Sequence, residues 1–517
     1  MKTSPSDYLG GTALIRMPKK YLFILLFILM VSRCAYIRPF QQSRTPADQL
    51  KAELDQIFNE PAFSNAYWGV VVQSLKNGEY LYLRNHHKNF IPASNMKLFT
   101  TAAALVKLGP EFRYSTKFYI NGSIDQNGIL HGDLIIAGSG DPTITGRYYK
   151  GNIHDPLEFW IDSLRAQNIT AIEGDIIGDD NYFAEEIMGE GWAWDYQSDW
   201  YAAQISALSF NDNCMSIYFA AGDTIGYPAK YHLLPETDYV HIINKVSTVR
   251  NGLEKEITFN RKRGTNQVEI RGTISIDSSP KRDLFSVENP TLFTTTVFKQ
   301  ILERNGILVS GSPRDIDDLE DYIYQQDQAN LIFRYFSPLL WEIVETINKV
   351  SQNLYAELLL RTLGAYFHGI GDARHGIEVV KEFLQSIGIY SEQFLMVDGS
   401  GLSRLNMITP NHVVKLLRFM RRHASGEYFY KSLPIAGVDG TLKNRMQQTT
   451  AEGNVRAKTG YVGYVRALSG YITTADNEEL AFSIIANNYS VPTPMANLIQ
   501  DLVCERLANF TRFQSFN

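Results

Sequence analysis

Cysteine is scarce in this sequence, and the residues present form neither a metal-binding nor a redox pattern. The three are Cys34, Cys214 and Cys504, and no two of them make a C-x-x-C pair. A zinc ribbon and a thioredoxin-like site both need closely spaced cysteines, so both are excluded. An odd, sparse set also gives little support for a disulfide framework.

An excess of positive charge is also absent. The chain has 49 Lys and Arg against 55 Asp and Glu, for a net charge of −6. This balance argues against nucleic acid as a partner, because nucleic-acid-binding domains carry clustered basic residues. With 517 residues, 44% of them hydrophobic, the composition is typical of a globular protein of two or three domains.

The apolar run near the N-terminus is short for a stable membrane span. Two lysines precede apolar residues 21–31, which are the proportions of a signal peptide. We therefore expect an exported protein, located in a periplasm or on the outer face of a membrane. Residues 1–45 then form a signal or anchor segment followed by a polar linker.

The exact start and the fate of this segment stay open at this point. If Met17 rather than Met1 is the first residue, the signal is compact and ends at Cys34. Lipidation at Cys34, with membrane association, is the alternative to simple cleavage. Arg33 disfavours it, because that position of a lipoprotein signal usually holds a small residue.

The first candidate for chemistry, Ser94-Asn-Met-Lys97, begins a segment with the 3.6-residue apolar period of a helix. Residues three apart share a helix face, so a neutral Lys97 can take the proton of Ser94 and activate it as a nucleophile. The motif alone is equally consistent with a plain helix cap. The same spacing recurs at 278–281, where an internal proline indicates a loop.

Two further short motifs follow in chain order. In Ser351-Gln-Asn353, between helical segments, a second hydroxyl can relay a proton and a carboxamide can hold a substrate amide. In Lys458-Thr459-Gly460, before a β-like segment, the first two residues can bind a carboxylate and the glycine admits a close substrate backbone. Alone, each motif is weak: S-x-N recurs at 209–211, and K-T-G also suits a plain turn.

The order of the three motifs changes this assessment, because S-x-x-K, S-x-N and K-T-G in this order resemble the signature of penicillin-binding proteins and class A β-lactamases. The sequence resembles the low-molecular-mass penicillin-binding proteins of the D-Ala-D-Ala carboxypeptidase/endopeptidase type, over roughly residues 50 to 510. That family carries domains inserted between its first two motifs, and this chain has room for them. Other segments that look like the family are Gly138–Thr143, Gly191–Asp195, Ser206–Asn211, Asp398–Arg404 and Gly437–Leu442.

The resemblance implies an α/β fold of the penicillin-binding/β-lactamase-like transpeptidase class. Residues 46–112 and 321–517 would form a mainly antiparallel sheet flanked by helices, and residues 113–320 would form a β-rich inserted region. It also implies a serine D-Ala-D-Ala carboxypeptidase or endopeptidase that acts on peptidoglycan stem peptides and is inhibited by β-lactams. No cofactor or metal is expected.

The resemblance also implies a role for each motif residue. Ser94 would be the acylated nucleophile, Lys97 its general base, and Ser351 the relay that passes a proton to the departing D-Ala. The backbone N–H groups of Ser94 and Tyr461 would form an oxyanion hole. The substrate-binding residues would be Asn353 for the amide and Lys458, Thr459, Gly460 and Tyr461 around the terminal carboxylate.

Two positions depart from the family pattern. Gln352 stands where Asp or Asn is common, and Tyr461 follows K-T-G where Thr is usual. The change at Tyr461 could alter carboxylate binding or the fit of particular β-lactams. Neither change removes a proposed reacting group, because a backbone N–H survives substitution.

Two other functions remain as alternatives. A β-lactamase or esterase on the same scaffold is one, and the large insertion argues against it. A non-catalytic cell-wall-binding protein is the other. The presence of both Ser94 and Lys97 argues against that function, because a binding module needs no base.

Other candidate residues have simpler explanations. Asp398-Gly-Ser400 suggests a serine on a tight turn, but the chain has no G-x-S-x-G, so we expect a structural loop near the site. His86 and His87 suggest a metal site, but adjacent side chains on a strand point to opposite faces. No H-E-x-x-H occurs, and we expect this pair to be surface residues.

Overall fold

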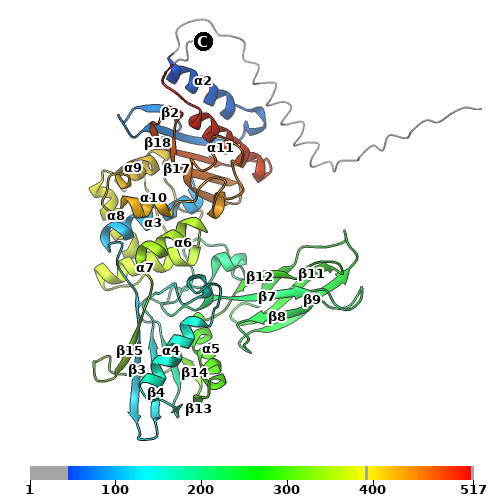
Figure 1. The fold of residues 1–517 in the computed structure, drawn as a ribbon, viewed down its shortest axis with the longest axis vertical. Coiled ribbons are helices and arrows are strands. Elements are labelled where there is room, and N and C mark those ends of the chain that lie inside the picture. Colours follow the sequence, from blue (N-terminus) through cyan, green and yellow to red (C-terminus); the bar gives the residue numbers. More distant parts are fainter. Residues whose placement is uncertain (1–44, 391–393, 514–517) are drawn as a thin grey trace, which may run out of the picture.

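Two separate stretches of the chain build one α/β unit, and the residues between them build the rest of an elongated molecule (Figure 1). The computed structural model describes residues 45–390 and 394–513. The predicted signal segment and Cys34 lie outside these residues. Among the described helices, none combines the length and the apolar character that a membrane span requires.

The centre of the α/β unit is a five-stranded antiparallel sheet. Its order is β16-β17-β18-β1-β2, so strands from the end of the chain pair with strands from its beginning. The strands are β1 (Tyr67–Ser74), β2 (Tyr80–Arg84), β16 (Arg456–Val462), β17 (Val465–Thr473) and β18 (Glu479–Asn487).

Both faces of this sheet are covered, which explains why β1 is apolar along most of its length. Successive side chains of a strand point to opposite faces. Trp68, Val70 and Val72 accordingly join one hydrophobic core, while Val71 joins the other.

Helices form a layer on each side of the sheet (Figure 1). The core that contains Val70 is closed by α2 and α11, and the core that contains Val71 is closed by the remaining helices. Their bounds are α2 (Pro46–Phe58), α11 (Thr493–Ala508), α3 (Met96–Lys107), α6 (Leu340–Lys349), α7 (Asn353–His368), α8 (Ala373–Ser386), α9 (Pro410–Met420) and α10 (Gly426–Ser432). The predicted α/β fold, an antiparallel sheet flanked by helices, is confirmed.

The inserted region contains a seven-stranded mixed sheet with two helices packed against it. β3 and β4 form its long central hairpin, and the shorter strands pair outward from them. The elements are β3 (Ser115–Ile124), β4 (Ile129–Ala137), α4 (Asp155–Ala166), β5 (Ala171–Ile172), β6 (Ile176–Asp179), α5 (Pro290–Arg304), β13 (Leu308–Val309), β14 (Pro313–Asp315) and β15 (Leu331–Phe336).

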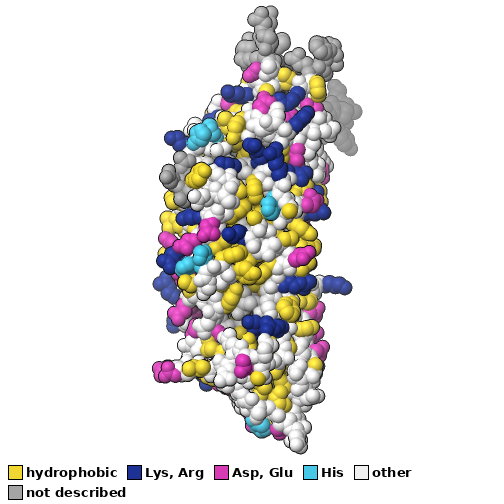
Figure 2. Space-filling view, turned by 90° about the vertical axis from the view of Figure 1, so that its left-hand side faces the viewer, with side chains coloured by type: hydrophobic (Ala, Val, Ile, Leu, Met, Phe, Trp, Pro, Cys, Tyr) yellow, Lys and Arg dark blue, Asp and Glu magenta, His cyan; other side chains and the backbone are white. Residues whose placement is uncertain are grey.

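Two three-stranded sheets complete the insertion and project sideways from the long axis (Figure 1). One has the order β12-β7-β8 and the other β10-β11-β9. Their strands are β7 (Cys214–Ala220), β8 (Lys230–Leu234), β9 (His241–Val249), β10 (Thr258–Arg261), β11 (Gln267–Ser275) and β12 (Lys281–Ser286). Figure 2 shows one long face of the molecule, on which basic and acidic side chains are interspersed.

The chain enters and leaves the inserted region at one place. Tyr114 N donates to Ser337 Oγ at 2.9 Å, and Ser337 N donates to Tyr114 O at 3.2 Å. Directly after this crossing, Ser115 of β3 pairs with Phe336 of β15. Because β15 returns antiparallel to β3, the sheet of the inserted region continues past residue 320, where the sequence places its end.

Candidate active site

Ser94 lies in a short turn that leads into α3. The sequence predicts a helix from Ser94 onward, whereas the structure places Ala93–Asn95 in the 3-10 turn η2 and begins α3 at Met96. Ala93 has a φ of 48°, in the left-handed region that non-glycine residues seldom adopt. Such strain is often found at functional sites. Ser94 is only partly buried, so its hydroxyl remains accessible.

Lys97 is fully buried, and its amine has three oxygen partners. Nζ lies 3.0 Å from Ser94 Oγ, 2.6 Å from Asn353 Oδ1 and 2.6 Å from the backbone oxygen of Ser400. Burial lowers the pKa of Lys97 to about 7, although two nearby carboxylates oppose the shift. A large fraction of the amine is therefore neutral at neutral pH, as a general base for Ser94 must be.

A second serine–lysine pair lies beside the first. Ser351 occupies the turn between α6 and α7 with a φ of 63°. Lys458 Nζ, on β16, donates to Ser351 Oγ at 2.8 Å and to the backbone oxygen of Thr459 at 3.0 Å. Burial lowers the pKa of Lys458 well below its ordinary value, and the charge of Lys97 adds to this shift.

The other two residues of the second motif, Gln352 and Asn353, form hydrogen bonds with neighbouring residues. Asn353 Nδ2 donates to the backbone oxygen of Tyr201 at 2.7 Å, while its Oδ1 accepts from Lys97. Asn353 therefore orients Lys97 here, and its contact with a substrate amide stays a prediction. Gln352 is the N-cap of α7, and its Oε1 accepts from Leu354 N at 3.3 Å. Gln352, which departs from the family pattern, thus caps the N-terminus of α7.

The K-T-G segment lies in β16, one of the two edge strands of the sheet, next to the Ser94 turn. A Cβ placed on Gly460 would lie 2.7 Å from the backbone oxygen of Pro92 and 3.2 Å from Ala93 Cβ. Glycine thus allows β16 to approach the turn this closely.

The remaining two residues of this segment differ in exposure. Thr459 is buried, and its Oγ1 donates to Thr441 Oγ1 at 2.7 Å. Tyr461 is 56% exposed, and the Arg466 guanidinium lies over its ring at 5.2 Å from the centroid. Tyr461 is thus the motif residue most open to solvent at the end of β16.

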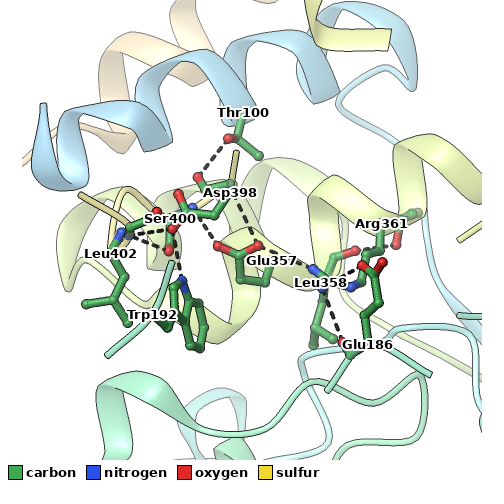
Figure 3. Close-up of polar contacts among 12 residues, drawn as sticks. Thr100, Glu186, Trp192, Glu357, Leu358, Arg361, Asp398, Ser400 and Leu402 are labelled. Carbon is green, nitrogen blue, oxygen red and sulfur yellow. Dashed lines mark hydrogen bonds and ion pairs between the residues drawn. The ribbon is translucent and has the colours of Figure 1, made fainter. Parts of the chain in front are cut away.

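The loop that the sequence indicates as structural, residues 398–403, lies against Lys97 and is here called the Ser400 loop. Figure 3 shows how Asp398 holds it from inside. Asp398 accepts from the backbone N–H groups of Gly401 at 2.8 Å and Ser403 at 2.6 Å, and from Trp192 Nε1 at 3.0 Å. The loop is therefore folded around a buried carboxylate.

Gly401 allows the Ser400 loop to pack closely against the Ser94 turn. Its φ is +80°, and a Cβ there would lie 1.9 Å from the backbone oxygen of Ala93. Any side chain at this position would meet that backbone and would also be strained by the left-handed conformation.

The sequence prediction missed a buried ion pair beneath the loop. On α7, Arg361 Nη1 lies 3.3 Å from Glu357 Oε2, and neither side chain is exposed. Glu357 also accepts from the backbone N–H groups of Gly399 at 3.2 Å and Ser400 at 2.8 Å (Figure 3). A signal did exist, because two charged residues four apart interrupt the apolar run 354–363.

His86 and His87 lie at the surface, as expected, with His86 half-buried and His87 exposed. They follow β2, which ends at Arg84, and their ring centroids lie 3.5 Å apart. The expectation of opposite faces is wrong, because the strand ends before the pair. Over the described ranges, the group of carboxylates or imidazoles close enough to hold a metal ion lies in the inserted region and consists of Asp180, Asp315 and Asp317.

The structure thus brings the residues of all three motifs into one site, although their individual roles stay predictions. A serine beside a buried, partly neutral amine, a second hydroxyl–amine pair and an antiparallel sheet flanked by helices define a serine enzyme of the penicillin-binding class. Residues 50–509 match the model of the D-Ala-D-Ala carboxypeptidase 3 (S13) family. The chain belongs to this family and is a serine-type D-Ala-D-Ala carboxypeptidase.

Individual relatives agree with the family match. A D-alanyl-D-alanine carboxypeptidase of Actinomadura sp. (strain R39) is 33% identical over 483 residues, covering 90% of this chain and 86% of the relative. The solved structure of penicillin binding protein 4 from Haemophilus influenzae superposes with a TM-score of 0.76 at 25% identity, covering 88% of this chain and 99% of that one. The resemblance inferred from the motifs is confirmed, and neither alternative function is favoured.

Proposed function

We propose that this carboxypeptidase works through an acyl-enzyme on Ser94 and removes the terminal D-Ala from peptidoglycan stem peptides. The observation that carries the proposal is the contact of 3.0 Å between Lys97 Nζ and Ser94 Oγ, in a setting where burial lowers the pKa of the amine to about 7. A base near neutrality next to a partly exposed hydroxyl is what serine acylation needs.

In the first half-reaction Lys97 takes the proton of Ser94 Oγ, and the oxygen attacks the carbonyl carbon of the penultimate D-Ala. The bond between Oγ and carbon forms, and the bond from carbon to the leaving nitrogen breaks. That nitrogen needs a proton to depart as an amine. Ser351 Oγ, in contact with Lys458 Nζ at 2.8 Å, is placed to deliver it. The proton that Lys97 took from Ser94 replaces the one that Ser351 gives up, so Lys97 is neutral again and Ser351 keeps its hydroxyl when the acyl-enzyme has formed.

In the second half-reaction a water molecule attacks the ester on Ser94 and releases the shortened peptide. Lys97 accepts a proton from the water and returns one to Ser94 Oγ, which regenerates the starting state. Backbone N–H groups of Ser94 and Tyr461 would stabilise the negative oxygen in both steps, and Thr459 and Lys458 would bind the terminal carboxylate.

The same attack should make this protein a target of β-lactams. The Haemophilus influenzae penicillin binding protein 4, with 25% identity, has also been solved in complex with a β-lactam and superposes on this chain with a TM-score of 0.70. A β-lactam carbonyl would acylate Ser94 in the way the peptide does. The ring-opened drug would then remain on the serine.

The experiment that tests the acyl-enzyme is labelling with a fluorescent penicillin, followed by mass spectrometry of the labelled peptide. We expect a stable adduct on Ser94 in the wild-type protein and none in Ser94→Ala. Absence of a wild-type adduct while the drug stays intact would contradict the proposal. Rapid hydrolysis of the drug without an adduct would instead indicate a β-lactamase.

Carboxypeptidase and endopeptidase action share the same acylation and differ only in the leaving group. We include endopeptidase cleavage of cross-linked peptides in the proposal, because Ser94 is partly exposed at the surface. Incubation with a stem pentapeptide and with a cross-linked dimer, followed by chromatography, separates the two. Release of D-Ala alone would restrict the protein to trimming.

We also propose that the protein is exported, because its substrate lies outside the cytoplasm and residues 21–31 have signal-peptide proportions. Cell fractionation should place the mature protein in the periplasm or at the outer membrane face. Intact mass then distinguishes a cleaved chain from one acylated at Cys34. Recovery of the full-length chain from the cytoplasm would contradict export.

A further inference from the structure

The amine of Lys97 has a geometry that depends on the Ser400 loop. A neutral amine has two N–H donors and one lone pair. Asn353 Oδ1 and the Ser400 backbone oxygen, each 2.6 Å from Nζ, accept two donors. The lone pair then faces the third partner, Ser94 Oγ. The direction in which Lys97 can take a proton is therefore set by how firmly these two acceptors are held.

The Asn353 acceptor is fixed by a single contact, the bond from its Nδ2 to the backbone oxygen of Tyr201. The Ser400 acceptor is fixed differently. The two peptide N–H groups around it, those of Gly399 and Ser400, both donate to the carboxylate of Glu357. These bonds hold the backbone that leads into Ser400, so Glu357 fixes where this residue starts. A peptide unit is planar, and the N–H that shares a plane with the Ser400 carbonyl is that of Gly401, which donates to Asp398 Oδ1 at 2.8 Å. Glu357 and Asp398 therefore hold Ser400 from its two sides, and together they set where its carbonyl points.

Glu357 is itself held in place from the far side. Arg361 Nη1 contacts Glu357 Oε2, and Arg361 Nη2 continues to the backbone oxygen of Glu186 at 3.2 Å (Figure 3). Neither Glu357 nor Arg361 is exposed to solvent. The ion pair thus forms a buried support between α7 and the Ser400 loop, and no substrate can reach it.

We propose that Glu357 is a positioning residue for the Ser94–Lys97 pair: through the Ser400 loop it aims the lone pair of Lys97 at Ser94, and it supplies negative charge beneath the amine. This inference rests on the proposed acyl-enzyme and adds to it a residue that touches neither substrate nor Ser94. Because burying an isolated charged carboxylate is costly, its retention here with a guanidinium partner agrees with a specific role.

Charge and geometry act on Lys97 together. Burial lowers the pKa of Lys97, and Asp398 and then Glu357 oppose the shift. Burial also raises the pKa of Glu357, and Arg361 opposes that change. The groups that face Lys97 are Ser94 from η2, Asn353 from α7, the Ser400 carbonyl and Asp398 from the loop, Glu357 from α7, and Lys458 from β16.

Two substitutions separate geometry from charge. Glu357→Gln removes the charge and leaves one oxygen to serve two N–H groups. In a plot of acylation rate against pH, the rate falls on the acid side of the pKa of Lys97; this part is here called the acid limb, and the constant rate above it the plateau. We expect the acid limb to move to lower pH by about one unit, because a negative charge near Lys97 is lost. We also expect the plateau rate to fall about tenfold or more, because the Ser400 acceptor is less firmly held. Glu357→Asp keeps the charge but shortens the side chain, so the plateau should fall while the limb stays.

The measurement is the second-order rate of acylation by a fluorescent penicillin from pH 5 to pH 9, with circular dichroism as the folding check. The matched control is Asp501→Asn. Asp501 lies on α11, on the opposite face of the sheet, and forms a partly buried ion pair with Arg445 at 2.6 Å. It should lower thermal stability and leave both the limb and the plateau unchanged.

The outcomes test the proposed function and the positioning role of Glu357 separately. A wild-type protein that penicillin does not acylate would contradict the proposed function. A normally acylated wild type with an unchanged Glu357→Gln profile would overturn the positioning role, as would a control that shifts the limb equally. If Glu357→Gln does not fold, Glu357→Asp still decides, because a wild-type plateau in that variant would also overturn it.

Discussion

Lys97 and Lys458 occupy neighbouring sites and are both fully buried, yet their surroundings differ. The Lys97 amine has three oxygen partners and two carboxylates, Asp398 and Glu357, that favour its charged form. The Lys458 amine has one hydroxyl and one backbone oxygen, and its charged neighbours are Lys97 and Arg466. The charged neighbours of Lys97 are thus anionic, and those of Lys458 are cationic.

The difference teaches that burial alone does not assign a role to a lysine. With its pKa near 7, Lys97 can both take and return a proton at neutral pH. Burial and the charge of Lys97 lower the pKa of Lys458 well below its ordinary value, and a bound anion would favour its charged form. The first site therefore suits a base, and the second suits the recognition of a carboxylate.

The strongest test of this contrast is removal of the base. Lys97→Met keeps the apolar stem and deletes the amine, so nothing takes the proton from Ser94. We expect acylation by a fluorescent penicillin to slow about 10³-fold or more. Retention of a tenth of the wild-type rate in a folded variant would show that another group is the base.

The second lysine should matter less for the chemical step. Lys458→Met removes the partner of Ser351 and the cation for the terminal carboxylate, and we expect acylation by a fluorescent penicillin to slow about 10²-fold. The same acylation assay on both variants gives the comparison directly. A loss equal to that of Lys97→Met would remove the distinction between the two sites.

The pH profile sharpens the contrast without a mutation. The neutral form of Lys97 is the active one, so kcat/KM should fall about tenfold for each unit below the pKa and level off above it. Since the pKa of Lys97 is lowered to about 7, the acid limb should begin near that pH. A D-Ala release assay from pH 5 to pH 9 measures it, and a limb more than one unit away would contradict the assignment.

The smallest effect concerns Lys458 and is seen in binding. A substrate carboxylate favours the charged form of a nearby lysine, so binding should take up about one proton. Calorimetry of the Ser94→Ala variant with a D-Ala-D-Ala peptide, in two buffers of different ionisation enthalpy, gives the number of protons. If no proton is taken up, Lys458 is already charged in the free enzyme and resembles Lys97 more than we infer.

Much of this site is predictable from sequence because its parts are local. Ser94 and Lys97 are three residues apart, and a helical turn brings them together. The helix Ala373–Ser386 is also local, because an amphipathic period in the sequence defines it. The order of the three motifs then indicated the family, and the family resemblance predicted that the three segments meet in one site.

The rest depends on contacts between segments that no spacing rule connects. Nothing in the sequence shows that the Ser400 carbonyl reaches Lys97, or that Glu357 supports it. The left-handed backbone of Ala93 and Ser351 is equally hidden, because neither residue prefers that conformation. Tertiary structure imposes both, and the predicted helix start at Ser94 fails for this reason.

The crossing of Tyr114 and Ser337 has a consequence for how the enzyme assembles. Once the inserted region folds, its two ends meet, and the chain between Ser94 and Ser351 behaves as a far shorter loop. Loop-closure entropy then opposes their meeting by about 2 kcal/mol less than an unstructured insert would. The insertion thus brings its own anchor points together, and it also supplies Trp192 and Tyr201, which hold Asp398 and Asn353 at the active site.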